Sequence, residues 1–143
     1  MAFTYFSLIA PRDEAGPRFD EASHRLQQLP ETRLVAASEP AKVPDTRADE
    51  RCKVVGVRSG LKARVLLDAC IAIEAAMGRD HTAVWAPRPI DIDLLVYDDI
   101  EIRSARLHLP HPFAHSRRYV IEPLRQIAPD VAAWVERVGT RPR

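Results

Sequence analysis

The pattern of apolar and polar positions predicts strands and helices that alternate along the chain. Runs of apolar and β-branched residues are typical of buried strands, and they cover residues 3–9, 33–38, 51–58, 90–97 and, briefly, 100–102. Apolar residues at helical spacing, bounded by proline or glycine, predict helices, which cover residues 16–30, 61–77, 117–127 and 129–138. The order of strand, helix, two strands, helix and strand predicts an α+β fold, a ferredoxin-like split βαβ sandwich with a mainly antiparallel sheet.

The length and composition are typical of one globular domain, expected to span residues 1–143. Hydrophobic residues make up 46% of the chain and charged residues 29%, and the net charge is only +1. This balance argues against a nucleic-acid partner, and no apolar stretch is long enough for a membrane span. Cys52 and Cys70 form no disulfide framework. The cysteine usage and the lack of a basic leader favour a cytoplasmic setting.

Two aspartates interrupt the strand predicted over residues 90–97. Side chains alternate between the faces of a strand, so Asp91 and Asp93 should point the same way, about 7 Å apart at roughly 3.3 Å of rise per residue. The opposite face should hold Ile90, Ile92, Leu94 and Val96. Two like charges this close are unfavourable unless a cation or a proton lies between them. The simpler alternative is a solvated face of an edge strand.

Arginines and a histidine surround the two aspartates along the chain. They are Arg79 and Arg88 before the strand, and Arg106, His111, Arg117 and Arg118 after it. Carboxylates bind hard cations, and guanidinium groups donate to phosphate oxygens, so the combination predicts a site for a magnesium-chelated polyphosphate. Two carboxylates could also bridge a pair of ions about 3.5–4 Å apart. The sequence contains no G-x-x-x-x-G-K-[ST], so any ATP site lacks a Walker A loop.

A longer motif runs through these charges. It reads "WAPRPIDIDLLVYDD" and then "LHLPHPFAHSRRYVIEPLRQIAP", over residues 85–129, and "IEAAMGR" precedes it at residues 73–79. In order and spacing, the motif resembles the 6-hydroxymethyl-7,8-dihydropterin pyrophosphokinase family, with its W-G-P-R-x-x-D-x-D signature, its L-x-(V/L)-P-H-P stretch and its P-L-x-E-I-A-P. The earlier run resembles that family's E-x-x-x-G-R at a helix end.

The resemblance implies an enzyme of folate biosynthesis in which ATP donates a pyrophosphoryl group to a reduced pterin and AMP leaves. It implies that Asp91 and Asp93 hold two magnesium ions, while Arg79 and Arg88 neutralise charge during the transfer. The further contacts that it implies are Trp85, Arg106, His111 and Arg117 for ATP, and Lys53 and Tyr119 for the pterin. The expected partners are therefore ATP and a reduced pterin, bound by a monomer or homodimer.

The N-terminal half departs from the family's pattern. Residues 9–11 read Ile-Ala-Pro where the family has G-S-N. Arg51 or Cys52, followed by Lys53, stands in place of an aromatic residue and a pterin-binding asparagine, and lysine offers donors only. Three interpretations therefore stay open. The chain is the folate enzyme with a divergent pocket, a pyrophosphokinase for another reduced pterin alcohol of a methanopterin-type pathway, or a non-catalytic nucleotide-binding relative.

Overall fold

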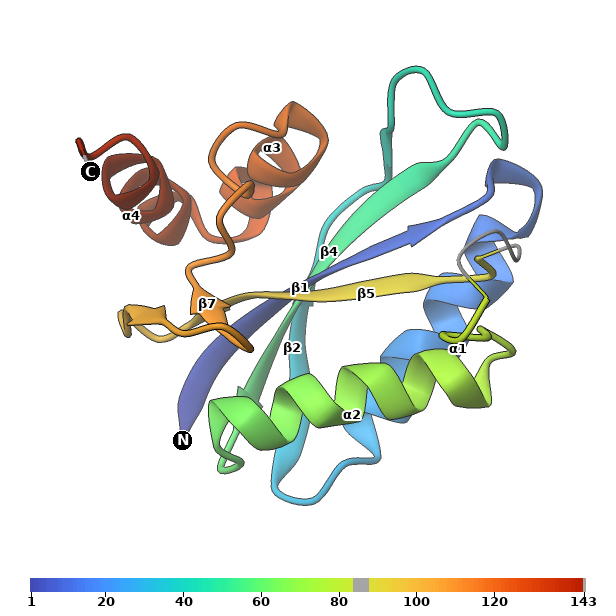
Figure 1. The fold of residues 1–143 in the computed structure, drawn as a ribbon, viewed down its shortest axis with the longest axis horizontal. Helices are drawn as coiled ribbons and strands as arrows, with labels where there is room; N and C mark the ends of the chain where they lie inside the picture. The colour runs from blue at the N-terminus through green and yellow to red at the C-terminus, as the bar shows by residue number, and fades with distance from the viewer. Residues whose placement is uncertain (84–87, 143) are drawn as a thin grey trace.

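A computed structural model describes residues 1–83 and 88–142 (Figure 1). The main sheet contains β1 (Ala2–Ala10), β2 (Thr32–Ala37), β3 (Ala41–Lys42), β4 (Arg51–Ser59) and β5 (Asp91–Tyr97). The helices are α1 (Ala15–Gln27), α2 (Ala63–Ala76), α3 (Arg118–Ile127) and α4 (Pro129–Gly139), with a short 3₁₀ turn, η1 (Arg12–Glu14). A separate hairpin pairs β6 (Ile102–Arg103) with β7 (His108–Leu109).

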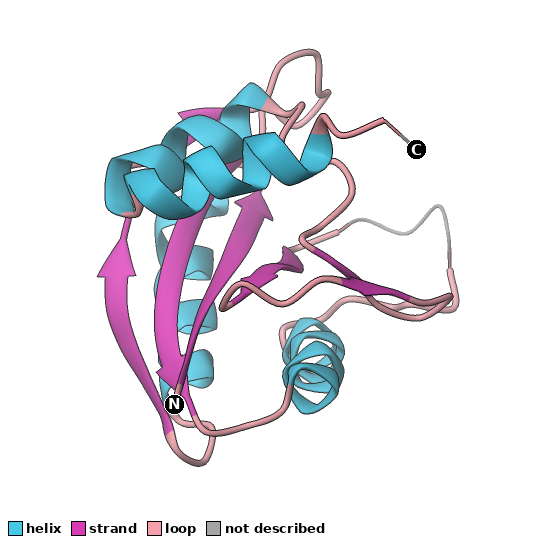
Figure 2. Cartoon of the chain, turned by 90° about the vertical axis from the view of Figure 1, so that its left-hand side faces the viewer, coloured by secondary structure: helices cyan, strands magenta, loops and turns pink. Residues whose placement is uncertain are grey.

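The main strands lie in the order β2-β4-β1-β5, and each neighbouring pair is antiparallel. The short strand β3 pairs with the first residues of β4. Two helices, α1 and α2, cover one face of the sheet (Figure 1). The other two, α3 and α4, lie side by side across the opposite face (Figure 2). The predicted ferredoxin-like α+β fold is confirmed.

Each face of the sheet has its own hydrophobic core, because strand residues alternate between the two sides. The core beneath α1 and α2 includes Phe6, Leu8, Leu26, Val55 and Leu66. The core beneath α3 and α4 includes Ile9, Cys52, Val54, Leu124 and Val135. Both strands at the centre of the sheet, β1 and β4, contribute to both cores, so the two helical layers are fixed to one common sheet.

A β-bulge in β5 changes the predicted alternation. The register between β1 and β5 shifts and leaves Leu95 without a partner in the ladder. Leu94 packs in the core beneath α1 and α2, but Val96 packs with Leu95 on the opposite face. The prediction that Val96 shares the face of Leu94 is wrong, because the extra residue of a bulge changes the side to which later residues point. Asp91 and Asp93 precede the bulge, so their common direction is unaffected.

The shortest elements were the least predictable. Two-residue strands are too short to show periodicity, so the sequence pattern predicts neither β3 nor β7. The strand expected over residues 100–102 is Ile102–Arg103, and the helix expected from residue 61 begins at Ala63. Among the helices of residues 1–83 and 88–142, none has the length and hydropathy needed to cross a membrane.

Gly56 makes room for an aromatic ring at the centre of the sheet. It pairs directly with Tyr5 across β4 and β1, and a Cβ atom at position 56 would lie 2.8 Å from Tyr5 Cε1. That separation is shorter than a van der Waals contact, so any larger residue there would displace the buried Tyr5 ring.

We expect Gly56→Ala to lower the free energy of unfolding by about 1–3 kcal/mol, because it overpacks the core. Gly16→Ala is the matched control, since Gly16 lies exposed in the first turn of α1 with no atom within 4 Å of an added Cβ. There the change should be neutral or stabilising by less than about 1 kcal/mol. Urea denaturation of both variants tests this, and equal effects would contradict the role given to Tyr5.

Candidate active site

A cavity of about 650 Å³ wraps around the edge of the sheet at the first residues of β5. Its floor includes Ile9 at the end of β1, and one wall comes from α2, including Glu74. The opposite wall comes from the segment before α3 and from its first turn, including Arg117 and Tyr119. The cavity therefore joins segments that lie far apart in sequence.

Most of the predicted site residues meet in this cavity. The seven that line it are Arg79, Arg88, Asp91, Asp93, His111, Arg117 and Tyr119. Trp85 lies outside the residues that the structure describes. Lys53 and Arg106 do not line the cavity.

Lys53 points away from the cavity because of the strand register. It pairs with Leu8 of β1, whose side chain is buried beneath α1 and α2. Its neighbour Cys52 pairs with Ile9, which lines the cavity. A difference of one residue reverses the face of a strand, so the geometry favours Cys52 as the counterpart of the family's asparagine.

Arg106 lies in the turn between β6 and β7, where its guanidinium pairs with the carboxylate of Asp68 on α2. Both side chains are more than half exposed, at 59% and 58%. Exposed ion pairs of this kind contribute about 0–1 kcal/mol. The pair is therefore weak enough to open when a negatively charged ligand approaches.

Glu74 organises the catalytic wall of the cavity. Its side chain is only 7% exposed, and its Oε2 accepts hydrogen bonds from Ile92 N at 2.8 Å and from Arg79 Nη1 at 2.6 Å. Its Oε1 lies 3.1 Å from His81 Nε2. Because β5 is at the edge of the sheet, Glu74 also satisfies a backbone donor that no neighbouring strand could reach.

Asp91 lies between two arginines. Arg79 Nη1 donates to Asp91 Oδ1 as well as to Glu74, so one guanidinium nitrogen bridges the two carboxylates. Arg88 Nη1 lies 3.8 Å from Asp91 Oδ2, and the Arg88 side chain is 54% exposed. Arg79 is therefore held in position by a buried partner, whereas Arg88 is free to move toward a ligand.

Asp93 lies deeper in the cavity, and burial raises the pKa of its carboxyl group. Within the described ranges its side chain accepts no hydrogen bond. Nearby, burial lowers the pKa of His111, whose Nδ1 accepts a hydrogen bond from Phe113 N at 3.2 Å. A buried carboxylate without a donor is stabilised by a cation, so Asp93 and Asp91 fit a divalent metal.

The donor set of the cavity suits magnesium. Among the residues that are described, no three His, Cys, Asp or Glu side chains are grouped closely enough to bind a metal together. Magnesium usually takes one or two protein carboxylates and completes its coordination with water and phosphate oxygens. Asp91 and Asp93 on one wall, facing arginines, match that requirement.

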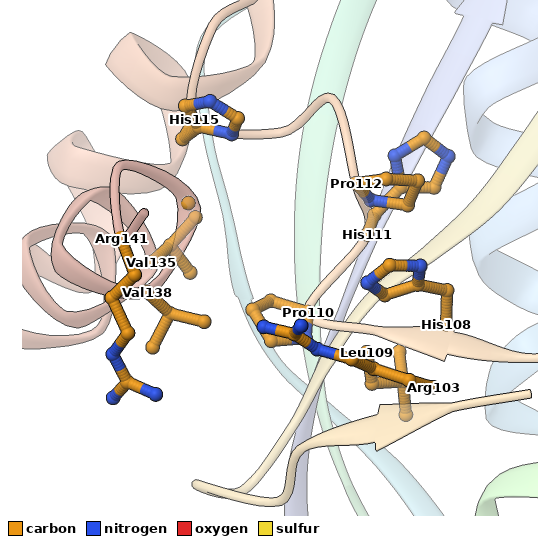
Figure 3. A pocket seen from close by; sticks show the side chains of 11 residues that line it. Arg103, His108, Leu109, Pro110, His111, Pro112, His115, Val135, Val138 and Arg141 are labelled. Carbon is orange, nitrogen blue, oxygen red and sulfur yellow. The ribbon is translucent and has the colours of Figure 1, made fainter. Parts of the chain in front are cut away.

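His111 also borders a second, smaller cavity of about 60 Å³, between β7 and α4 (Figure 3). Figure 3 shows its ring directed away from Val135 and Val138 of α4. In the same cavity Arg141 is engaged by Glu101, with Nη1 and Oε1 3.0 Å apart. His111 lines both cavities, and its imidazole ring points away from α4.

Comparison with known proteins agrees with this geometry. The family model described as 7,8-dihydro-6-hydroxymethylpterin-pyrophosphokinase (HPPK) matches residues 12–129. The chain belongs to this family. Residues 12–129 contain every site residue that the sequence predicts, in both the metal-binding and the pterin-binding parts.

Several relatives carry the name 2-amino-4-hydroxy-6-hydroxymethyldihydropteridine pyrophosphokinase. The protein of Methylorubrum extorquens is 39% identical over 121 residues, which are 82% of this chain and 77% of the relative. The Pseudomonas aeruginosa protein is 36% identical over 130 residues, 87% of this chain and 77% of its own length. The Haemophilus influenzae protein is 31% identical over 135 residues, which are 92% of this chain and 84% of the relative. The similarity to HPPK proteins therefore extends through the divergent N-terminal half.

The sequence pattern assigns no individual role to Glu74, although this residue belongs to the E-x-x-x-G-R run. The signal that could have revealed it is its spacing, because Glu74 lies four residues after the buried Cys70 and eight after the buried Leu66. An acidic residue that continues the apolar stripe of a helix must be buried, and a buried carboxylate needs partners.

We expect Glu74→Ala to lower the free energy of unfolding by about 3–5 kcal/mol, because it leaves Ile92 N without an acceptor and removes the buried partner of Arg79, which keeps only Asp91. Glu21→Ala is the control, since Glu21 forms an exposed ion pair with Arg25 on α1. Its cost should stay below about 1 kcal/mol. Chemical denaturation measures both free energies of unfolding. An effect at Glu74 as small as that at Glu21 would contradict the claim that Glu74 organises this wall of the cavity.

Proposed function

We propose that the chain transfers the pyrophosphoryl group of ATP to the hydroxymethyl oxygen of 6-hydroxymethyl-7,8-dihydropterin, a reaction of folate biosynthesis, and releases AMP. The observation that carries the proposal is the meeting of Asp91, Asp93, Arg79 and Arg88 in one cavity, within a chain of the pyrophosphokinase family. Carboxylates for a metal and guanidinium groups for phosphate are the two requirements of this chemistry.

In the reaction, the substrate oxygen bonds to the β-phosphorus of ATP while the bond from that phosphorus to the oxygen shared with the α-phosphate breaks. The hydroxymethyl group loses its proton, and AMP leaves with a developing negative charge. Catalysis of phosphoryl transfer rests mainly on positioning and on stabilising such charge. Magnesium, when bound, neutralises and orients the triphosphate, and we assign two ions to Asp91 and Asp93.

The arginines supply the remaining positive charge. Arg79 is positioned by Glu74, so it can donate to a phosphate oxygen without first ordering its side chain. Arg88 contacts Asp91 only loosely at 3.8 Å, and it can turn to a phosphate once a metal occupies that carboxylate. On the opposite wall, we assign His111 and Arg117, which line the cavity, to ATP. Trp85 and Arg106 complete the proposed ATP contacts.

The pterin compartment lies on the other side of the cavity. Tyr119 lines the cavity together with Ile9, Val43 and Pro44, and an aromatic ring among apolar residues suits a flat ring. The direction of Lys53 excludes it from this set, and Cys52 replaces the amide of the family's asparagine with a thiol. That replacement favours a second candidate function, in which the substrate is a different reduced pterin alcohol.

We further propose that one domain carries both compartments and works in the cytoplasm as a monomer or homodimer, with neither nucleic acid nor membrane as a partner.

Release of AMP from ATP and magnesium, measured with and without 6-hydroxymethyl-7,8-dihydropterin, tests the function directly. Pterin-dependent AMP is the expected result. Binding of ATP without AMP release would contradict it. In that case a screen of other reduced pterin alcohols separates a different pyrophosphokinase from a non-catalytic relative.

We expect Asp91→Asn and Asp93→Asn each to lower kcat by roughly 100-fold or more, because each removes a charged magnesium ligand. The matched control is Asp99→Asn, beyond the opposite end of β5, where the side chain is exposed. That variant should retain its turnover. Unchanged activity in either cavity variant, with the fold intact by circular dichroism, would refute the metal assignment.

A further inference from the structure

A fourth carboxylate, Glu50, lines the active-site cavity beside Asp91, Asp93 and Glu74. We propose that Glu50 determines specificity for the pterin by accepting hydrogen bonds from the ring N–H and the exocyclic amino group at the ring's pyrimidine edge. This inference rests on the proposed function. Glu50 has no counterpart among the residues that the sequence motifs identify.

The backbone holds Glu50 in a defined position immediately before β4. Glu50 N donates to Thr46 Oγ1 at 2.8 Å, and Val43 N donates to Glu50 O at 3.0 Å. The loop of residues 43–50 is thereby closed at its base. Glu50 precedes Cys52 by two residues, so both point to the face that carries Asp91 and Asp93.

The Glu50 carboxylate is available to a ligand. Throughout the ranges described, no hydrogen bond or ion pair engages its oxygens, whereas Glu74 is occupied by Arg79 and Ile92 N. Burial raises the pKa of Glu50, the negative charge of Asp91 adds to this effect, and the positive charge of Arg88 opposes it. A partly buried acceptor without a donor is unfavourable, and N–H groups of a bound ring would relieve that cost.

The surroundings of Glu50 favour a heterocycle over a phosphate. Ile9, Val43 and Pro44 give this part of the cavity an apolar lining, and Tyr119 adds an aromatic ring. A carboxylate repels phosphate, so the triphosphate belongs with the arginines near Asp91. A neutral ring with two adjacent N–H donors complements both the apolar lining and the carboxylate.

Cys52 cannot supply the missing recognition. It is fully buried, and burial raises the pKa of its thiol to about 12. A neutral thiol is a weak donor and a weak acceptor. We therefore assign the polar contact that an asparagine would make from β4 to Glu50, which lies on the same face of the sheet as Cys52.

The test compares two ligands that differ at this edge. One is 6-hydroxymethyl-7,8-dihydropterin, and the other is its dihydrolumazine analogue, which carries a carbonyl in place of the amino group. Isothermal titration calorimetry with magnesium and a non-hydrolysable ATP analogue gives the Kd of each ligand without requiring turnover. We expect the wild-type chain to prefer the pterin, since the analogue's carbonyl would face the carboxylate of Glu50.

Glu50→Gln should weaken pterin binding by about tenfold or more and should reduce the preference for the pterin over the analogue by at least about tenfold. A glutamine amide can donate to the analogue's carbonyl, which a carboxylate cannot do. Affinity for the ATP analogue and the magnesium requirement should not change. Glu122→Gln is the control, because Glu122 pairs with Arg118 at the exposed start of α3, and it should keep the wild-type preference.

The outcomes separate this inference from the proposed function. If the wild-type chain binds the pterin but releases no AMP, the function fails, while the Kd values still test Glu50. An unchanged preference in Glu50→Gln would overturn the role of Glu50, and so would a lack of pterin binding by the wild-type chain. A higher magnesium requirement with unchanged pterin affinity would also overturn it, because Glu50 would then belong to the metal site.

Discussion

The buried carboxylate of Glu74 is the group on which the rest of the site depends. β5 is an edge strand, so the N–H of Ile92, between the two aspartates, has no strand to accept it. Glu74 accepts that hydrogen bond from α2 and fixes the helix to the strand. The buried charge of Glu74 requires a nearby cation. Arg79 provides it, and the same guanidinium also donates a hydrogen bond to Asp91. One acid thus couples the packing of α2 to the position of Asp91, a proposed metal ligand.

The cavity divides into two parts of different chemistry. On the β5 side, acidic side chains are paired with arginine side chains, and this arrangement suits a polyanion together with its cations. On the β4 side, Glu50 lines the same cavity as Ile9, Val43, Pro44 and the ring of Tyr119, a combination that suits a flat polar-edged ring. The charges of Asp91 and Arg88 also act on Glu50, so the proposed nucleotide and pterin parts of the cavity adjoin each other.

The sequence was sufficient for the architecture and for most of the site. Long elements show clear periodicity, and the motif around Asp91 and Asp93 identifies the residues that meet in the cavity. Sequence did not reveal which of Cys52 and Lys53 shares the sheet face of the cavity residue Ile9, because that depends on the pairing of β4 with β1. Nor did it reveal the role of Glu74, whose partners come from two other segments. Contacts between distant segments are a property of the fold, and no local pattern records them.

The bulge at Leu95 has a consequence for how β5 tolerates change. Before the bulge, the strand directs Asp91 and Asp93 into the cavity, and after it Leu95 and Val96 both pack beneath α3 and α4. The first half of β5 therefore supplies side chains to the cavity, and the second half supplies side chains to the hydrophobic core. The turn that follows β5 is held separately, because Phe3 N donates to Asp98 Oδ1 at 2.8 Å. The common direction of Asp91 and Asp93, which we assign to magnesium, is therefore set by the part of the strand before the bulge.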